Sequence, residues 1–130
     1  MQIKLEKNFL ISLSINDKHV NASEETEKEE VIFKYNAEFG DNEFFIVFEM
    51  ALETLEGKIL TLIYKSIFLT DGNIDDDFKR SKFPHINAPA IAYPFLRAYI
   101  STITLNSGFA PVMLPSINFV SLWDEKQKQI

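Results

Sequence analysis

The sequence predicts an α+β fold, in which a four-stranded antiparallel sheet is followed by one long and one short helix. Two patterns carry this prediction: alternating apolar and polar residues in the first half of the chain, and an almost uncharged segment near its end. With 130 residues and a hydrophobic fraction of 46%, the chain has enough apolar material for one core. We therefore expect a single domain over residues 1–130.

The first strand is expected over residues 3–15, which end in a regular alternation. The apolar side of that alternation is formed by Phe9, Ile11, Leu13 and Ile15. The polar segment from His19 to Glu30, which ends in SEETEKEE, then predicts a solvated connection between strands, with an acidic docking arm as the alternative.

Three further strands are expected over residues 31–39, 43–54 and 58–70, joined as a meander. A turn at Asp41 and Asn42 places Phe39 opposite Phe44, and a three-residue loop with Gly57 in the left-handed conformation sets the next register. This register gives the sheet one apolar face, formed by Phe44, Ile46, Phe48, Met50, Leu52, Leu60, Leu62, Tyr64 and Phe68. The opposite face carries Glu43, Glu49 and Glu53 among apolar residues, which is typical of a sheet with one packed and one wet side.

Between the sheet and the long helix, Asp71, Asn73 and Asp75 have the alternate spacing of a calcium-binding loop. The required glycine is replaced by Asp76, and Lys82 stands where the bidentate glutamate belongs. We therefore expect no metal here, and we interpret the segment as a mobile loop.

The long helix is expected over residues 88–106, with Asn87 as its N-cap and Gly108 as its stop signal. Pro94 inside it predicts a kink or a broken first turn. The helix is apolar nearly all round, with its large side chains at Ile91, Phe95, Leu96, Tyr99, Ile100 and Ile103. One sheet covers only one side, so a second copy of the chain is expected to cover the other, which predicts a homo-oligomer.

Arg97 is the single charged residue between Ile86 and Trp123. A guanidinium cannot be neutralised, so it needs a carboxylate or several carbonyls, or it must reach the rim. A structural role and a ligand-binding role both remain open for it.

The net charge of −6 and the pI near 4.9 argue against nucleic acid and favour a basic partner. There is no cysteine, and His19 and His85 have no partner at a catalytic spacing. We therefore expect neither an enzyme nor a cofactor. The start of the chain lacks the pattern of a leader peptide, and no apolar run has the length of a membrane span, so a cytoplasmic protein is expected.

The last third of the chain resembles the SecB family of bacterial protein-export chaperones. The motifs are NAPAIAYPFLR at 87–97, NSGF at 106–109 and LPSINFVSLW at 114–123. They match in order the family's aromatic-Pro-x-x-Arg helix, its glycine turn, its Pro-containing linker and the Asn-Phe pair that opens its short helix. We expect that short helix over residues 118–127.

The resemblance implies a Greek-key-like sheet, tetramers built as dimers of dimers, and a groove for unfolded polypeptide. Carried over to this chain, the client-binding positions are Phe119, Leu122, Trp123, Tyr64, Phe48 and Tyr35. The family also delivers precursors to the SecA motor through an acidic sheet face, for which Glu43, Glu49 and Glu53 are the candidates in this chain. The family's crossover loop is rich in aromatic residues, whereas the loop of this chain has none.

Two hypotheses from different classes follow. The first is an ATP-independent holdase for unfolded polypeptides, either preproteins for export or a dedicated client such as an antitoxin. Twelve Phe, four Tyr and one Trp supply the flat apolar rings that bind many sequences. The second is an oligomeric adaptor that grips one folded partner.

Overall fold

The computed structural model describes residues 1–18 and 31–128. The strands are β1 (Ile3–Asp17), β2 (Ile32–Phe39), β3 (Glu43–Glu53) and β4 (Lys58–Thr70), and the helices are α1 (Asp76–Arg80), α2 (Ala88–Asn106) and α3 (Phe119–Lys128). The sheet is antiparallel, with the Greek-key order β1-β4-β3-β2. The predicted α+β fold is thus confirmed. The predicted solvated connection or acidic arm, His19 to Glu30, lies outside the described residues.

The register of β2, β3 and β4 is the predicted one. Phe39 lies opposite Phe44, and Leu52 lies opposite Leu60. The hairpin between β3 and β4 closes with a 2.8 Å hydrogen bond from the Thr54 amide to the Lys58 carbonyl. Gly57 has a φ of 83°, a left-handed conformation that other residues adopt only with strain. The predicted apolar face is therefore the buried face.

Strand β1 differs from the prediction because its register shifts twice, between Leu5 and Lys7 and between Leu10 and Ser12. Each shift inserts an extra residue and reverses which side of the sheet the next side chains occupy. Phe9 consequently lies opposite Lys65 on the outer face, whereas Leu13 lies opposite Leu62 on the core face. The expectation that Phe9 shares a face with Leu13 and Ile15 was wrong.

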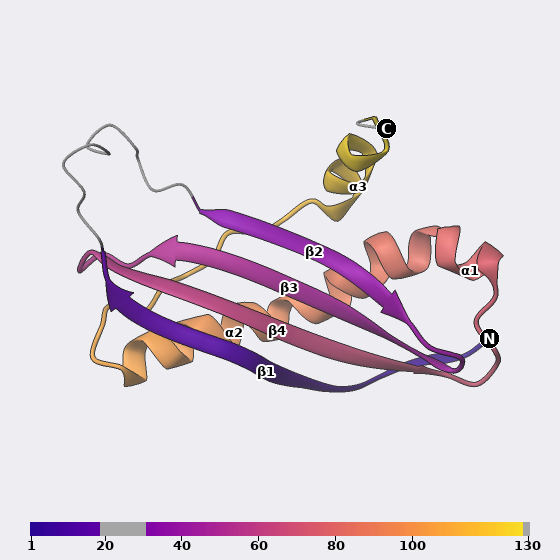
Figure 1. The fold of residues 1–130 in the computed structure, drawn as a ribbon, viewed down its shortest axis with the longest axis horizontal. Helices are drawn as coiled ribbons and strands as arrows, with labels where there is room; N and C mark the ends of the chain where they lie inside the picture. Colours follow the sequence, from indigo (N-terminus) through magenta and orange to yellow (C-terminus); the bar gives the residue numbers. More distant parts are fainter. Residues whose placement is uncertain (19–30, 129–130) are drawn as a thin grey trace.

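Helix α2 lies along the apolar face of the sheet and continues without a break through Pro94 (Figure 1). Its buried side is formed by Ala88, Pro89, Ala92, Tyr93, Leu96, Ile100 and Thr104. The Thr104 hydroxyl donates to the Ile100 carbonyl at 2.7 Å and accepts from the Val112 amide at 3.0 Å. These bonds tie the segment after α2 to the helix, so the chain can turn back toward α3.

The segment before α2 is more ordered than expected. It contains α1 and a π-helical turn, η2 (Phe83–Asn87). Phe78 and Phe83 pack on Phe44 with centroid distances of 5.5 and 6.3 Å, so the interpretation as a mobile loop was wrong. Asn87 has helical backbone angles and makes no capping bond, because η2 runs directly into α2. The predicted N-cap is therefore an interior helical residue.

Candidate functional site

A row of aromatic rings crosses the sheet beneath α2 and α3. Tyr64 of β4 lies opposite Phe48 of β3, whose ring is 5.9 Å from Phe33 of β2. Tyr93 of α2 packs on both Phe33 and Phe48, at 5.8 and 6.3 Å. Such rings make contacts by area rather than by direction, so the row is a candidate site for apolar ligands.

Helix α3 closes one end of this row with its first side chain. The Phe119 ring packs edge-on against Tyr35 at 5.2 Å and against Tyr93 at 5.6 Å. The helix begins here because Asn118 accepts a hydrogen bond from the Ser121 amide at 3.0 Å, as a capping residue does. Tyr93 also donates to the Pro115 carbonyl at 2.7 Å. The short helix is thereby anchored to both β2 and α2.

The outer half of α3 is held by two further contacts at the edge of the sheet, beyond β2 (Figure 1). The Trp123 indole stacks on His85, with 4.1 Å between centroids and 10° between planes. Lys126 donates to the Tyr35 carbonyl at 2.7 Å, and its ammonium lies 3.9 Å from the centroid of the Tyr35 ring. Burial lowers the pKa of Lys126. The Tyr35 hydroxyl completes the cluster by donating to the His85 carbonyl at 3.0 Å.

The six predicted client-binding positions do not have the same accessibility. Phe48, Tyr64, Tyr35 and Phe119 are buried, while Leu122 and Trp123 of α3 are half-buried. Tyr64 packs on Tyr99, away from α3. Phe119 and Tyr35 are therefore covered where α3 packs against β2.

Four side chains of this cluster were not among the predicted site residues: Phe33, Tyr93, His85 and Lys126. Phe33 and Tyr93 carry a detectable signal, since one lies on the apolar face of its strand and the other in the aromatic-Pro-x-x-Arg motif. His85 and Lys126 are brought to β2 by tertiary packing, which no local pattern in the sequence reveals.

The outward side of α2 carries exposed apolar residues. Ile91, Phe95 and Leu105 are 45%, 49% and 59% exposed, and Ala98 and Thr102 lie between them at helical spacing. We call these five residues the α2 stripe. Among the other predicted interface residues, Tyr99 and Ile103 are half-buried, while Leu96 and Ile100 are fully buried in the core of the subunit. Only part of the predicted interface set therefore faces outward.

The outer face of the sheet is mixed rather than uniformly acidic. Glu43, Glu49 and Glu53 are exposed there, and Glu53 forms an ion pair with Lys18 at 3.0 Å. Partly or fully buried apolar side chains lie between the carboxylates: Phe45, Val47, Ile63 and Ile67.

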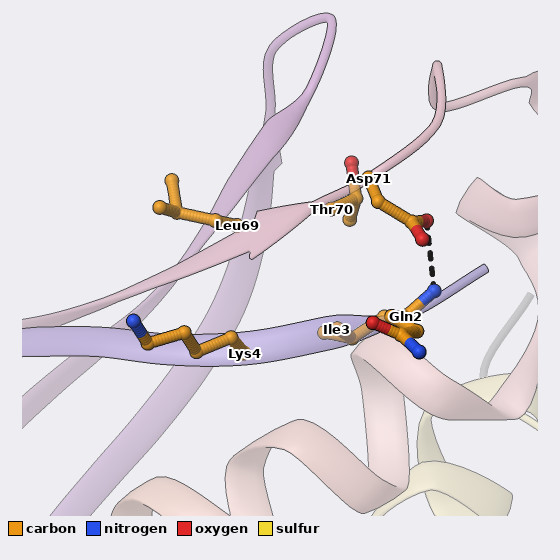
Figure 2. Close-up of a pocket in the computed structure, with 6 residues that line it drawn as sticks. All are labelled: Gln2, Ile3, Lys4, Leu69, Thr70 and Asp71. Carbon is orange, nitrogen blue, oxygen red and sulfur yellow. Dashed lines mark hydrogen bonds between the residues drawn. The ribbon is translucent and has the colours of Figure 1, made fainter.

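The loop that resembles a calcium site uses its oxygens for structure. A hollow of about 470 Å³ lies at the end of β4. There Asp71 accepts a hydrogen bond from the Gln2 amide at 2.8 Å (Figure 2). Asn73 accepts from the Asn42 side chain, and Asp75 caps α1 by accepting from the Phe78 amide. In the described ranges, no group of three His, Asp or Glu side chains is placed to hold a metal.

Comparison with known proteins finds relatives named protein-export protein SecB. The chain is 31% identical over 86 residues to a protein-export protein SecB from Granulibacter bethesdensis, covering 61% of this chain and 49% of that one. It is 30% identical over 81 residues to a protein-export protein SecB from Anaplasma phagocytophilum, covering 60% of this chain and 50% of that one. The chain thus spans about half the length of the curated relatives it matches.

Two solved structures share the fold. One is a SecB-like chaperone from Mycobacterium tuberculosis, in complex with a ChAD peptide from the HigA1 antitoxin; the TM-score is 0.65, with 9% identity, over 88% of this chain and 89% of that one. The other is a protein of unknown function from Streptococcus agalactiae. Its TM-score is 0.67, with 11% identity, over 89% of this chain and 98% of that one.

An antiparallel sheet followed by a long helix and a short aromatic-anchored helix is the architecture that this chain shares with a SecB-like protein of known structure. The chain belongs to the SecB family, because the family model described as "Preprotein translocase subunit SecB" matches residues 2–130. In the part of the chain that the structure describes, no helix is both long and apolar enough to cross a membrane.

Proposed function

We propose that this protein is an ATP-independent holdase that binds unfolded polypeptides, in the cytoplasm, as a homo-oligomer. The observation that carries the proposal is the row of aromatic rings, whose β2 end is covered by Phe119 of α3. Its clients are preproteins destined for Sec-dependent export.

The proposal depends on α3 acting as a removable cover. A helix of 10 residues is too short to be stable alone in water, so its position relies on its side-chain anchors. Those anchors are Phe119, the stack of Trp123 on His85, and the bond from Lys126 to Tyr35. Elements held by few contacts open at a lower free energy than the core of the sheet, and opening α3 exposes Tyr35, Phe33 and Phe119.

Oligomerisation follows from the α2 stripe. When a second copy covers its apolar side chains, the free energy falls by roughly 25 cal/mol per Å² of apolar area removed from water. A symmetric contact between two α2 helices buries the same residues twice. A dimer of dimers is the assembly we propose.

Docking on a basic partner such as SecA is assigned to the outer face of the sheet. Exposed Glu43, Glu49 and Glu53 supply carboxylates for a basic partner, but apolar side chains interrupt them. Their charges steer association more than they set affinity.

The proposal is tested by aggregation of a chemically denatured enzyme after dilution, followed by light scattering without nucleotide. We expect a molar excess of the wild-type protein to suppress aggregation, and Trp123→Ala to change the protection by altering the α3 cover. Val120→Ala, at an exposed position of the same helix, is the matched control and should protect like the wild type. Aggregation that is unaffected by the wild-type protein would refute the holdase function.

A dedicated chaperone for one partner, such as an antitoxin, is the second candidate. It is favoured by the fold shared with the M. tuberculosis chaperone, whose structure holds an antitoxin peptide. A panel of unrelated unfolded proteins separates the two candidates, since a general holdase protects most of them and a dedicated chaperone protects one.

A further inference from the structure

The sheet has two edge strands, β1 and β2, because the strand order is β1-β4-β3-β2. The backbone N–H and C=O groups on the outer side of an edge strand can pair with an additional strand. On β1 the pairing register shifts twice, and such bulges interrupt a regular edge. The register of β2 runs from Ile32 to Phe39 without a shift, so β2 is the regular edge of the described sheet.

The hydrogen-bond pattern of the β2–β3 hairpin shows which residues of β2 face the open edge. The Gly40 amide donates to the Glu43 carbonyl at 2.8 Å, so these two opposed residues form a hydrogen-bonded pair. In an antiparallel ladder such pairs alternate with pairs that share no hydrogen bond. Phe33, Tyr35 and Ala37 therefore belong to pairs without hydrogen bonds, and their N–H and C=O groups point away from β3.

Lys126 of α3 occupies the middle of this edge. Its ammonium donates to the Tyr35 carbonyl at 2.7 Å and lies 3.9 Å from the centroid of the Tyr35 ring. No other described residue forms a hydrogen bond to the outward backbone groups of Phe33, Tyr35 or Ala37. A hydrogen bond from a charged donor is stronger than one from an amide, so the central acceptor of the edge is taken by the protein's own side chain.

The same movement of α3 opens both the edge and the aromatic rings. Helix α3 lies beyond β2 (Figure 1), and Phe119, Trp123 and Lys126 follow one another at helical spacing along the side that faces β2. A chain that pairs with β2 places every second side chain on the face that carries Phe33 and Tyr35. Such a chain gains main-chain hydrogen bonds and ring contacts together.

We propose that a captured polypeptide pairs with the outer edge of β2 as an extended strand, and that Lys126 competes with it for the Tyr35 carbonyl. The proposal rests on the polypeptide-binding function proposed above and specifies how the bound segment is held. Main-chain hydrogen bonds add affinity without reading side chains. The edge therefore accepts extended segments of many sequences and rejects a proline at a pairing position, because proline has no N–H to donate.

The test uses three fluorescently labelled peptides with one sequence, in which apolar and polar residues alternate, and it measures their affinity by anisotropy. The first is unmodified, the second carries N-methyl groups on the apolar residues, and the third carries them on the polar residues. In a paired strand, one alternate set of backbone groups points at the neighbouring strand and the other set points away. We expect one methylated peptide to bind the wild-type protein about tenfold more weakly than the unmodified peptide, and the other to bind as tightly.

Binding by the rings alone does not distinguish the two methylated peptides. Equal affinity for them would therefore overturn this inference and leave the holdase function standing, provided that the unmodified peptide binds. Failure of the unmodified peptide to bind would instead refute the holdase function, and this inference with it. Both outcomes are read on the wild-type protein, so neither depends on the folding of a variant.

Lys126→Met removes the ammonium and keeps an apolar side chain of similar length. We expect the unmodified peptide to bind this variant about tenfold more tightly than it binds the wild type, and the weakly binding methylated peptide to gain nothing. Lys128→Met, at an exposed position of the same helix, is the matched control and should leave all three affinities unchanged. An equal gain for all three peptides in Lys126→Met would show that Lys126 only holds α3 in place. That result, or no gain for any peptide, would overturn the proposed competition.

Discussion

The imidazole of His85 lies flat against the indole of Trp123, at 4.1 Å between centroids, and joins the π-helical turn before α2 to the short helix α3. These two residues are 38 positions apart in a chain that has a single tryptophan. The stack therefore holds α3 against η2. Because Trp123 is the single tryptophan, its fluorescence reports the position of α3.

Removing the imidazole should weaken the contact between α3 and η2. In His85→Ala we expect the Trp123 emission to shift to longer wavelength and to become more accessible to acrylamide, because one face of the indole loses its cover. Lys82→Ala, an exposed residue next to η2, serves as the control and should leave the spectrum unchanged. An unaltered emission in His85→Ala would show that the stack does not hold α3.

Truncating Phe119 should destabilise the protein much more than truncating its neighbour. Phe119 is 4% exposed and touches three aromatic rings, so Phe119→Ala is expected to cost about 3–5 kcal/mol of unfolding free energy. Val120→Ala, at a half-exposed position, should cost about 0.5 kcal/mol or less. Urea denaturation of the two variants makes the comparison, and similar costs would contradict the anchoring role of Phe119.

Charging the α2 stripe should dissociate the proposed oligomer. Phe95→Glu places a carboxylate at the centre of the apolar surface, where burial of the unpaired charge is costly. Leu55→Glu makes the same change at an exposed apolar residue on the hairpin between β3 and β4. Multi-angle light scattering should report fewer subunits for Phe95→Glu alone; a wild-type monomer would rule out the proposed interface.

Stability should fall in alkaline solution. Burial raises the pKa of Tyr35, Tyr64 and Tyr93 above the ordinary 10.0, so the unfolded chain releases these phenolic protons first and binds fewer protons than the folded one. The free energy of unfolding then decreases as pH rises above about 10. Burial lowers the pKa of Lys126, so this one group makes the stability rise with pH. The three tyrosines act in the opposite direction and outnumber it.

Urea midpoints at about pH 9 and about pH 11 measure this change. The decline should be smaller in Tyr93→Phe, which has one fewer buried phenol. A midpoint that rises over this interval would show that the tyrosines do not control alkaline stability.

The strand register could be predicted wherever the loop length and the apolar periodicity both constrained it. The three-residue loop at Gly57 fixed the pairing of Leu52 with Leu60, and every later pair on β3 and β4 followed from it. The faces of the β1 side chains were harder to predict, because a bulge changes the face of Phe9 and no proline or glycine marks its position. Asn118 and Ser116 were both candidate caps of the short helix, and the structure uses Asn118. The predicted cap at Asn87 failed because a π-helical turn precedes it.

The candidate site was predictable only in part. Phe119, Leu122 and Trp123 follow from the family motif, but no local pattern could show that α3 covers the rings beneath it. The contacts of His85 and Lys126 span 38 and 91 positions, so they depend on tertiary packing rather than on local sequence.

The most direct test of the account is isothermal titration of this protein with one polypeptide in two states, native and permanently unfolded, without nucleotide. We expect micromolar or tighter binding of the unfolded state, accompanied by a change in Trp123 emission, and no binding of the native state. Equal affinity for the two states, or none for either, would contradict the claim that the aromatic row beneath α3 receives unfolded chains.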